Sequence, residues 1–350
     1  MYYVNTYDSS GIRQKKDQIS QIDLQNKYQI WIDLEDPSIE ELNQIQEKFL
    51  IDANILNQYS SGLKKPQIRV LENYIFTIIL SIKFKTLQAI ETEAVYLFIG
   101  KNWLVTIHSN KMNLKRQIHQ IFENDKTVIE SSIKILYYNI LARIVEEYEQ
   151  VLTAIEIAMT DLEEKSLYNP SKKILVDLEG LSRQLIILRR YFWKAREMIN
   201  FLLYLEKGTT TENEKQNEIK YLKIIYDNIT ELLDLIESHK DTINSIRELY
   251  LAYISLQMND TMKTLTIFSV ILLPLTFITG FYGMNGVNLD NFLIVPSGLG
   301  LIIVSMIIII TILIIFFRKK QWISQKDYYN IEKEEKKGKK PKIRNNNNES

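Results

Sequence analysis

A stripe of small, polar and flexible side chains follows one face of an apolar segment near the C-terminal end of the sequence. At helical spacing its members are Met262, Thr266, Ser269, Leu273, Thr276 and Gly280, with Asn259 one turn earlier. Bulky apolar side chains flank it, including Ile267, Phe268 and Phe277. Two interpretations fit the stripe: close packing between membrane helices, which small residues favour, or the lining of a pore. The spacing alone leaves both open.

Two apolar segments long enough to cross a membrane organise this region. The first, 264–281, has 18 residues and the second, 292–317, has 26, whereas about 20 residues cross the hydrocarbon core of a bilayer. Asp290 is the only Asp, Glu, Lys, Arg or His in the whole region. The connecting loop, 282–291, is too short for a folded domain. We therefore expect a two-helix transmembrane hairpin whose ends lie on the same side of the membrane.

The charge that follows the second segment predicts the orientation of the hairpin. Residues 318–344 contain 11 Lys and Arg against 4 Asp and Glu, beginning with Arg318, Lys319 and Lys320. Cytoplasmic flanks of membrane segments carry such an excess of positive charge. We expect a multi-pass protein of the cell membrane with both termini in the cytoplasm, a basic tail at 318–350 and an extracellular loop. The first 16 residues have no apolar core, so no cleaved signal peptide is expected.

Residues 1–127 combine strand-length apolar runs with a helix start, which predicts a cytoplasmic α/β domain. The runs, rich in aromatic and β-branched residues, are 29–33, 74–80, 94–100 and 103–108. The last two flank a Gly-Lys-Asn turn and are expected to form a hairpin. The sequence Asp36-Pro37-Ser38, followed by two glutamates, is typical of a helix N-terminus.

From residue 128 the apolar spacing becomes helical. We expect two antiparallel cytoplasmic helices over 128–207, separated by Asn169-Pro170-Ser171. Residues 211–263 then continue into the first apolar segment with no proline before Pro274 and no glycine before Gly280. This predicts one helix of about 65–70 residues, roughly 100 Å long. So long a helix cannot bury itself alone, and we expect self-association. The fold class is thus an α+β cytoplasmic domain, long helices and a transmembrane hairpin.

Composition argues against several other classes of function. The chain has no cysteine, which excludes disulfides, thiolate metal sites and cysteine nucleophiles. The three histidines, His108, His119 and His239, show no ligand spacing. No phosphate-binding glycine loop, HExxH motif or nucleophile elbow occurs, so no enzyme activity is expected. The formal net charge is zero, which gives no indication of a nucleic-acid partner.

The residues that follow the stripe, Thr279-Gly-Phe-Tyr-Gly-Met-Asn285, resemble the signature of the CorA-type magnesium/cobalt transporter family. More of the chain is similar to that family in the same order. The further stretches are 31–37, 98–106, 258–267, 273–278 and the basic, Trp-ended exit 318–322.

The resemblance implies a homopentameric, funnel-shaped channel whose central pore is formed by the first membrane segment of each subunit. It places Gly283, Met284 and Asn285 at the outer mouth as the ion-selecting element. It directs five side chains toward the pore axis: Asn259, Met262, Leu265, Leu273 and Thr276. Ser269 and Gly280 of the stripe complete the expected lining. Met262 and Leu265 would form a hydrophobic constriction of the kind that gates by dewetting.

A ring of neutral amides suits magnesium, because Mg²⁺ sheds its water reluctantly and the amides can accept hydrogen bonds from the bound waters. Family members often carry a Met-Pro-Glu-like loop after the signature, and this chain has Asp290 there instead as the acid that could attract cations. Some members place a metal-sensing carboxylate where this chain has Ile224. The candidates for such a regulatory site are therefore Asp227, Glu231 and Asp234, although a solvated helix face is the favoured interpretation of any single one of them.

The expected function is influx of Mg²⁺, with Co²⁺ and Ni²⁺ as further candidates, down the membrane potential and gated by cytoplasmic Mg²⁺. No cofactor is expected apart from transported and regulatory Mg²⁺, and the expected partners are further copies of the chain and the lipid bilayer. A zinc transporter of the same architecture, proton-coupled or not, is one alternative. A membrane-tethered helical scaffold that conducts nothing is another.

Overall fold

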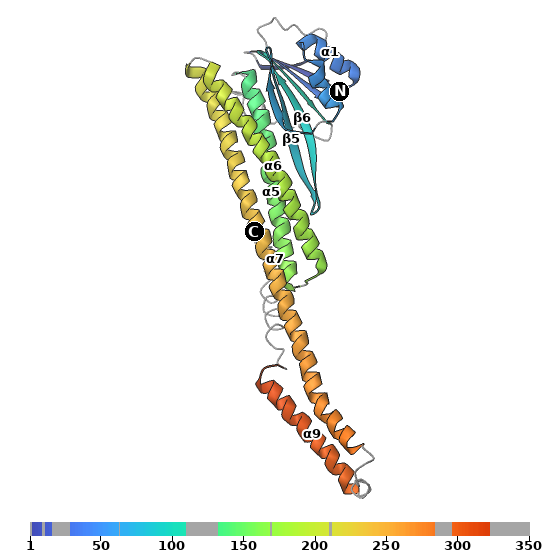
Figure 1. Cartoon of the computed structure of the whole chain (residues 1–350). Coiled ribbons are helices and arrows are strands. Elements are labelled where there is room, and N and C mark those ends of the chain that lie inside the picture. Colours follow the sequence, from blue (N-terminus) through green and yellow to red (C-terminus); the bar gives the residue numbers. More distant parts are fainter. Residues whose placement is uncertain are drawn as a thin grey trace, which may run out of the picture. The chain divides into compact units, whose positions relative to one another are not determined.

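The computed structural model describes residues 2–8, 11–15, 29–62, 64–109, 132–168, 170–209, 212–283 and 296–322. The chain divides into two compact units, Met1–Tyr253 and Ile254–Ser350. The first unit holds a sheet covered by helices, and the second holds two apolar helical segments (Figure 1).

The sheet of the first unit has seven strands of mixed direction. In chain order they are β1 (Tyr2–Asp8), β2 (Gly11–Lys15), β3 (Gln29–Glu35), β4 (Gln67–Val70), β5 (Ile75–Thr86), β6 (Ala89–Ile99) and β7 (Trp103–His108). Across the sheet the order is β2-β1-β3-β7-β6-β5-β4. Only β3 and β7 run parallel; every other neighbouring pair among the described strands is antiparallel.

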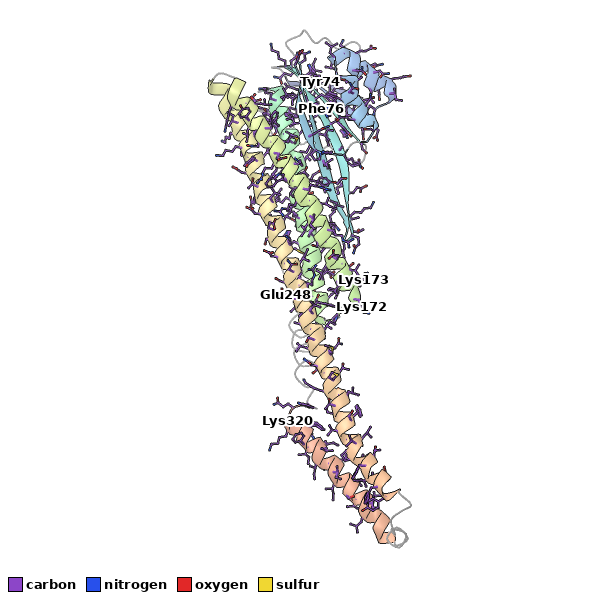
Figure 2. All side chains as sticks on the ribbon, viewed as in Figure 1. Tyr74, Phe76, Lys172, Lys173, Glu248 and Lys320 are labelled. Atoms are coloured by element: carbon purple, nitrogen blue, oxygen red, sulfur yellow. The ribbon has the colours of Figure 1, made fainter. Side chains whose placement is uncertain are left out.

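The four strands expected from the sequence are confirmed, and so is the hairpin between β6 and β7. Strands β1, β2 and β4 were not expected. Two of these are the short outer strands, Gly-Ile-Arg-Gln-Lys and Gln-Ile-Arg-Val, and too few of their residues are apolar to show a period. Phe76 of β5, labelled in Figure 2, packs on Phe98 of β6 with ring centroids 4.8 Å apart.

Two short helices, α1 (Ile39–Phe49) and α2 (Ala53–Ser60), follow β3. The expected start of α1 is confirmed as a capping box. The Ser38 hydroxyl accepts a hydrogen bond from the backbone N–H of Glu41, and the Glu41 carboxylate accepts one from the backbone N–H of Ser38.

The antiparallel helix pair is confirmed as α5 (Ile133–Tyr168) and α6 (Lys172–Thr209). Helix α5 lies along the sheet (Figure 1), where its Tyr148 hydroxyl donates to the carbonyl of Leu80 at 2.7 Å. The same ring stacks on Phe192 of α6 at 4.5 Å. Helix α6 continues two residues further than expected, through Gly208, where a turn was expected.

The long helix is confirmed as α7 (Glu212–Tyr282), which has 71 residues and continues through Pro274. Within the first unit it runs antiparallel to α6, since Arg189 contacts Glu237 at 2.9 Å and Glu179 contacts Arg247 at 3.7 Å. Its buried apolar positions end at Tyr250. Beyond that point no described apolar side chain of α7 is buried, although several are partly covered.

The second membrane segment is the helix α9 (Pro296–Lys319). Proline suits the first turn of a helix, because the N–H that it lacks has no partner there. The expected start at Phe292 falls partly outside the described residues. Among the described residues, two helical stretches are long and apolar enough to cross a membrane, Asn217–Tyr282 and Gly300–Lys319, and their most apolar windows are 0% and 6% buried.

Candidate functional site

The seven residues expected to line a pore lie on the described part of α7, and all of them are exposed in the single chain: Asn259, Met262, Leu265, Ser269, Leu273, Thr276 and Gly280. Bulky side chains on other faces are exposed as well, with Phe268 at 62%. Exposure therefore does not select one face of the helix. Thr264 and Thr279 also carry hydroxyls, but the stripe aligns three hydroxyls, a glycine and an amide along one face of the helix.

The hydroxyls of the stripe share one geometry. Thr266, Ser269 and Thr276 each donate to the backbone carbonyl four residues earlier, at 2.8, 2.9 and 3.0 Å. A hydroxyl that has given its proton to the backbone keeps its oxygen lone pairs as acceptors. The stripe therefore offers acceptors outward and no charged group. That chemistry suits the waters around a cation, which donate hydrogen bonds.

The N-terminal end of the stripe combines an ion pair with two large apolar side chains. Lys263 contacts Asp260 at 2.9 Å, so these opposite charges balance beside Asn259. Met262 and Leu265, the expected constriction, are 57% and 60% exposed.

Helix α7 ends at the expected signature. The backbone N–H of Gly283 donates to the carbonyl of Thr279 at 3.0 Å. A Cβ built on Gly283 would lie 3.1 Å from that same carbonyl oxygen, which leaves little room for any other residue. Met284, Asn285 and Asp290 lie outside the described residues.

The expected regulatory carboxylates Asp227, Glu231 and Asp234 are exposed on α7, as is Ile224 beside them. Glu231 faces a cleft of about 140 Å³ between α5 and α7, which Glu146 and Glu149 also line. Among the described residues of one chain, no three His, Asp or Glu side chains lie close enough to hold a metal ion.

The exit from α9 has the geometry of a membrane-interface anchor. Trp322 stacks on Phe317 with ring centroids 5.6 Å apart, and its backbone N–H donates to the Phe317 carbonyl at 3.0 Å. The ammonium of Lys320, labelled in Figure 2, lies 6.0 Å from the ring of Phe316. Aromatic and basic side chains are enriched where a membrane helix meets water.

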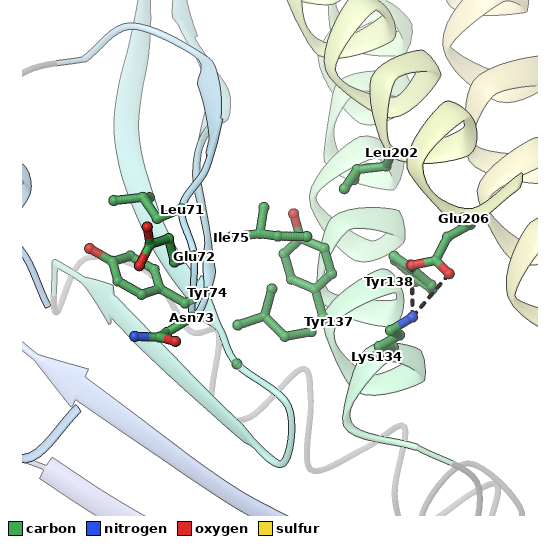
Figure 3. A pocket seen from close by; sticks show the side chains of 12 residues that line it. Leu71, Glu72, Asn73, Tyr74, Ile75, Lys134, Tyr137, Tyr138, Leu202 and Glu206 are labelled. Carbon is green, nitrogen blue, oxygen red and sulfur yellow. Dashed lines mark hydrogen bonds and ion pairs between the residues drawn. The ribbon is translucent and has the colours of Figure 1, made fainter. Parts of the chain in front are cut away.

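One polar cluster was not expected from the sequence. A cavity of about 210 Å³ lies between the turn before β5, the end of β6 and helices α5 and α6, and its wall includes Lys134 and Glu206 (Figure 3). Lys134 bonds both carboxylate oxygens of Glu206, at 2.9 and 3.0 Å. The two residues are 72 positions apart, so no local period could have indicated the pair.

Comparison with known proteins agrees with this architecture. The sequence profile of the family described as CorA-like Mg²⁺ transporter protein matches residues 26–319. The cobalt/magnesium transport protein CorA of Thermotoga maritima is 28% identical over 246 residues, 70% of this chain and 69% of that protein. The protein of the same name from Methanocaldococcus jannaschii is 28% identical over 280 residues, 79% of this chain and 86% of that protein.

A solved structure extends the agreement to the fold. The complete structure of the CorA magnesium transporter from Methanocaldococcus jannaschii superposes with a TM-score of 0.75 at 25% identity, over 92% of this chain and 99% of that one. The match spans the α/β domain, the long helices and the apolar C-terminal helix. With the profile covering most of its length, the chain belongs to the CorA family of divalent-cation transporters, whose members are not enzymes.

Proposed function

We propose that the chain conducts Mg²⁺, with Co²⁺ and Ni²⁺ as further candidates, through a pore lined by α7 of each subunit in a homopentamer. The proposal rests on one observation above all. The Thr266, Ser269 and Thr276 hydroxyls point their protons into their own helix and leave acceptor oxygens on one face of an otherwise apolar span. Such a face also permits close packing between membrane helices. Around an axis it provides a path of acceptors for a hydrated cation.

The proposed selectivity follows from hydration. Mg²⁺ prefers six oxygens at short distance and keeps several of its waters. Hydroxyl oxygens along the pore and a ring of Asn285 amides at the outer mouth would bind those waters rather than replace them. No carboxylate lies in the span to hold the ion strongly. Fast passage and preference for a compact, strongly hydrated dication then arise from the same groups.

The membrane potential supplies the driving force in this proposal. Both termini lie in the cytoplasm of a cell-membrane protein, and Asp290 lies in the extracellular loop, where it attracts cations. Two charges that cross 100 mV gain about 4.6 kcal/mol, twice the single-charge value. Inward flux then needs no chemical fuel.

Gating is proposed to act at Met262 and Leu265, whose apolar ring closes the pore by excluding water. Cytoplasmic Mg²⁺ would favour the closed form by bridging Asp227, Glu231 and Asp234 to acidic groups of a neighbouring subunit. Substituting all three by their amides is expected to leave flux high at millimolar cytoplasmic Mg²⁺, at which the unchanged protein closes.

The test is ion uptake by proteoliposomes that contain the full-length protein, under an inside-negative potential. Mg²⁺ uptake with competition by Co²⁺ and Ni²⁺ is expected. Asn285→Ala should lower the uptake strongly, whereas Asn291→Ala, an amide in the same loop, serves as the matched control. Uptake of Zn²⁺ but not Mg²⁺ would identify a zinc transporter. Absence of all flux would indicate a scaffold.

A further inference from the structure

Three helices meet at one charged cluster near the start of α7. Lys134 of α5 contacts Glu206 of α6 at 2.9 and 3.0 Å and Glu218 of α7 at 3.4 Å. The Tyr138 hydroxyl of α5 donates to Glu206 at 2.9 Å. The side chains of Glu206 and Glu218 are only 7% and 12% exposed. Each of the three helices thus contributes at least one polar side chain to the same partly buried cluster.

The charges at this point do not balance. Two carboxylates share one ammonium, which leaves an excess of one negative charge. The surrounding elements do not correct it. The turn before β5 adds another acid, Glu72, while β6 contributes apolar Ile99 and the backbone of Gly100. Among the described residues around the cavity, Lys134 is the only base.

The missing positive charge can be a proton. Burial raises the pKa of Glu218, the Lys134 ammonium lowers it, and the charge of Glu206 raises it again, with a net upward shift. Burial lowers the pKa of Lys134, but its contacts with Glu206 and Glu218 outweigh that effect and raise it, so the ammonium stays charged. Burial also raises the pKa of the Tyr138 phenol, which stays a donor. Glu218 is the member of the cluster that gains a proton as pH falls.

We propose that Lys134, Tyr138, Glu206 and Glu218 form a proton-sensitive latch that ties the start of α7 to α5 and α6. When the carboxylate pair takes up one proton, the ammonium balances a single remaining charge and the latch holds more firmly. If α7 carries the pore face proposed above, the latch connects cytoplasmic pH to the pore helix.

The sign follows from linkage. A carboxyl group whose pKa is raised by folding favours the folded contact when it is protonated. The gain is full below its unfolded value, near 4.5, and is lost as pH rises through the raised pKa of Glu218. The latch is therefore tightest at mildly acidic pH and weakest at pH 7.5 and above.

Hydrogen exchange of the full-length protein in detergent at pH 5.0, 6.0 and 7.5 tests this, after correction for the intrinsic pH dependence of exchange. Protection of residues 217–226 should rise as pH falls, by at most about tenfold per pH unit for one proton. Glu218→Gln imitates the protonated state and should give high protection at every pH. Glu248→Gln, an exposed acid further along α7 (Figure 2), should keep the pH response of the unchanged protein.

Protection that does not change with pH in the unchanged protein would overturn the latch, whether or not any variant folds. So would a Glu218→Gln protein that keeps the full pH response. A second variant, Lys134→Gln, removes the ammonium, and it should lose protection at pH 7.5 and regain part of it at pH 5.0. Ion flux takes no part in these readouts, so the latch and the proposed conduction can fail independently.

Discussion

Nε2 of His108 lies 3.1 Å from Oδ1 of Asp33, and this ion pair joins the two parallel strands in the interior of the sheet. Both side chains are 2% exposed. Thr106 donates a hydrogen bond to the same oxygen of Asp33 and accepts one from the Trp31 indole at 3.1 Å. Nδ1 of His108 lies 2.8 Å from the Ser109 carbonyl. Each ring nitrogen thus lies close to an oxygen, and the Asp33 carboxylate favours the protonated imidazole.

The stability of the α/β domain should depend on this proton. Burial by itself lowers the pKa of His108, but the contact with Asp33 and its charge outweigh burial and raise it above 6.5. The stabilising contribution is therefore full below pH 6.5 and is lost as pH rises through the raised pKa. Chemical unfolding followed by tryptophan fluorescence should show stability falling above pH 6.5. Asp33→Asn should cost about 3–5 kcal/mol, typical of a broken buried pair, and should flatten the pH dependence. A variant as pH-dependent as the unchanged protein would contradict the pairing.

Thr276→Val keeps the shape of the side chain and removes one acceptor from the stripe. The loss of one hydrogen bond to a hydrated ion, about 1 kcal/mol, should lower Mg²⁺ uptake by proteoliposomes roughly fivefold. Thr264→Val removes a hydroxyl from the opposite face of α7 and should leave uptake unchanged. Equal loss in both variants would show that the hydroxyls matter for helix packing rather than for the ion.

Gly283→Ala tests the end of α7. Its Cβ would press on the Thr279 carbonyl oxygen at 3.1 Å and would shift the start of the signature loop. If the shift costs the ion site about 1.4 kcal/mol, Mg²⁺ uptake should fall about tenfold. Gly300→Ala on α9 is the control, because a Cβ there meets no atom within 4 Å. Full uptake by the Gly283 variant would mean that the loop tolerates the shift.

Gly180→Ala tests how the tip of the long β5–β6 hairpin packs against α6. A Cβ at Gly180 would lie 2.6 Å from the Leu87 carbonyl oxygen, and Gln184 holds the same hairpin tip by donating to the Thr86 carbonyl at 3.0 Å. The added methyl should destabilise the first unit by about 1–3 kcal/mol, the usual cost of overpacking. Thermal unfolding followed by near-ultraviolet circular dichroism measures it. An unchanged midpoint would show that the hairpin tip moves aside freely.

Local patterns predicted much of this fold. The two apolar segments, the long helix without proline before Pro274 and the helix start at Ser38 all depend on neighbours within a few residues, and the structure has a helix at each place. Short strands such as β2 and β4 could not be found this way, because pairing with neighbours rather than side-chain period defines them.

The candidate site, too, could be predicted from the sequence only in part. The stripe on α7 repeats along one helix, so the sequence shows which residues share a face. It does not show that the hydroxyl protons of Thr266 and Ser269 turn inward. The cluster of Lys134, Glu206 and Glu218 comes from three helices, and Lys134 lies 72 and 84 positions from the two glutamates along the chain. Only the tertiary fold brings these charges together.

The most direct test of the pore face uses the absence of native cysteine. A single cysteine is placed at Thr276 on the stripe or at Ile271 on the opposite side of α7, and a membrane-impermeant, positively charged thiol reagent is added during Mg²⁺ uptake. The reagent should label Thr276→Cys and block its flux, and should leave the flux of Ile271→Cys unchanged. Labelling and block at Ile271→Cys, with none at Thr276→Cys, would contradict the account.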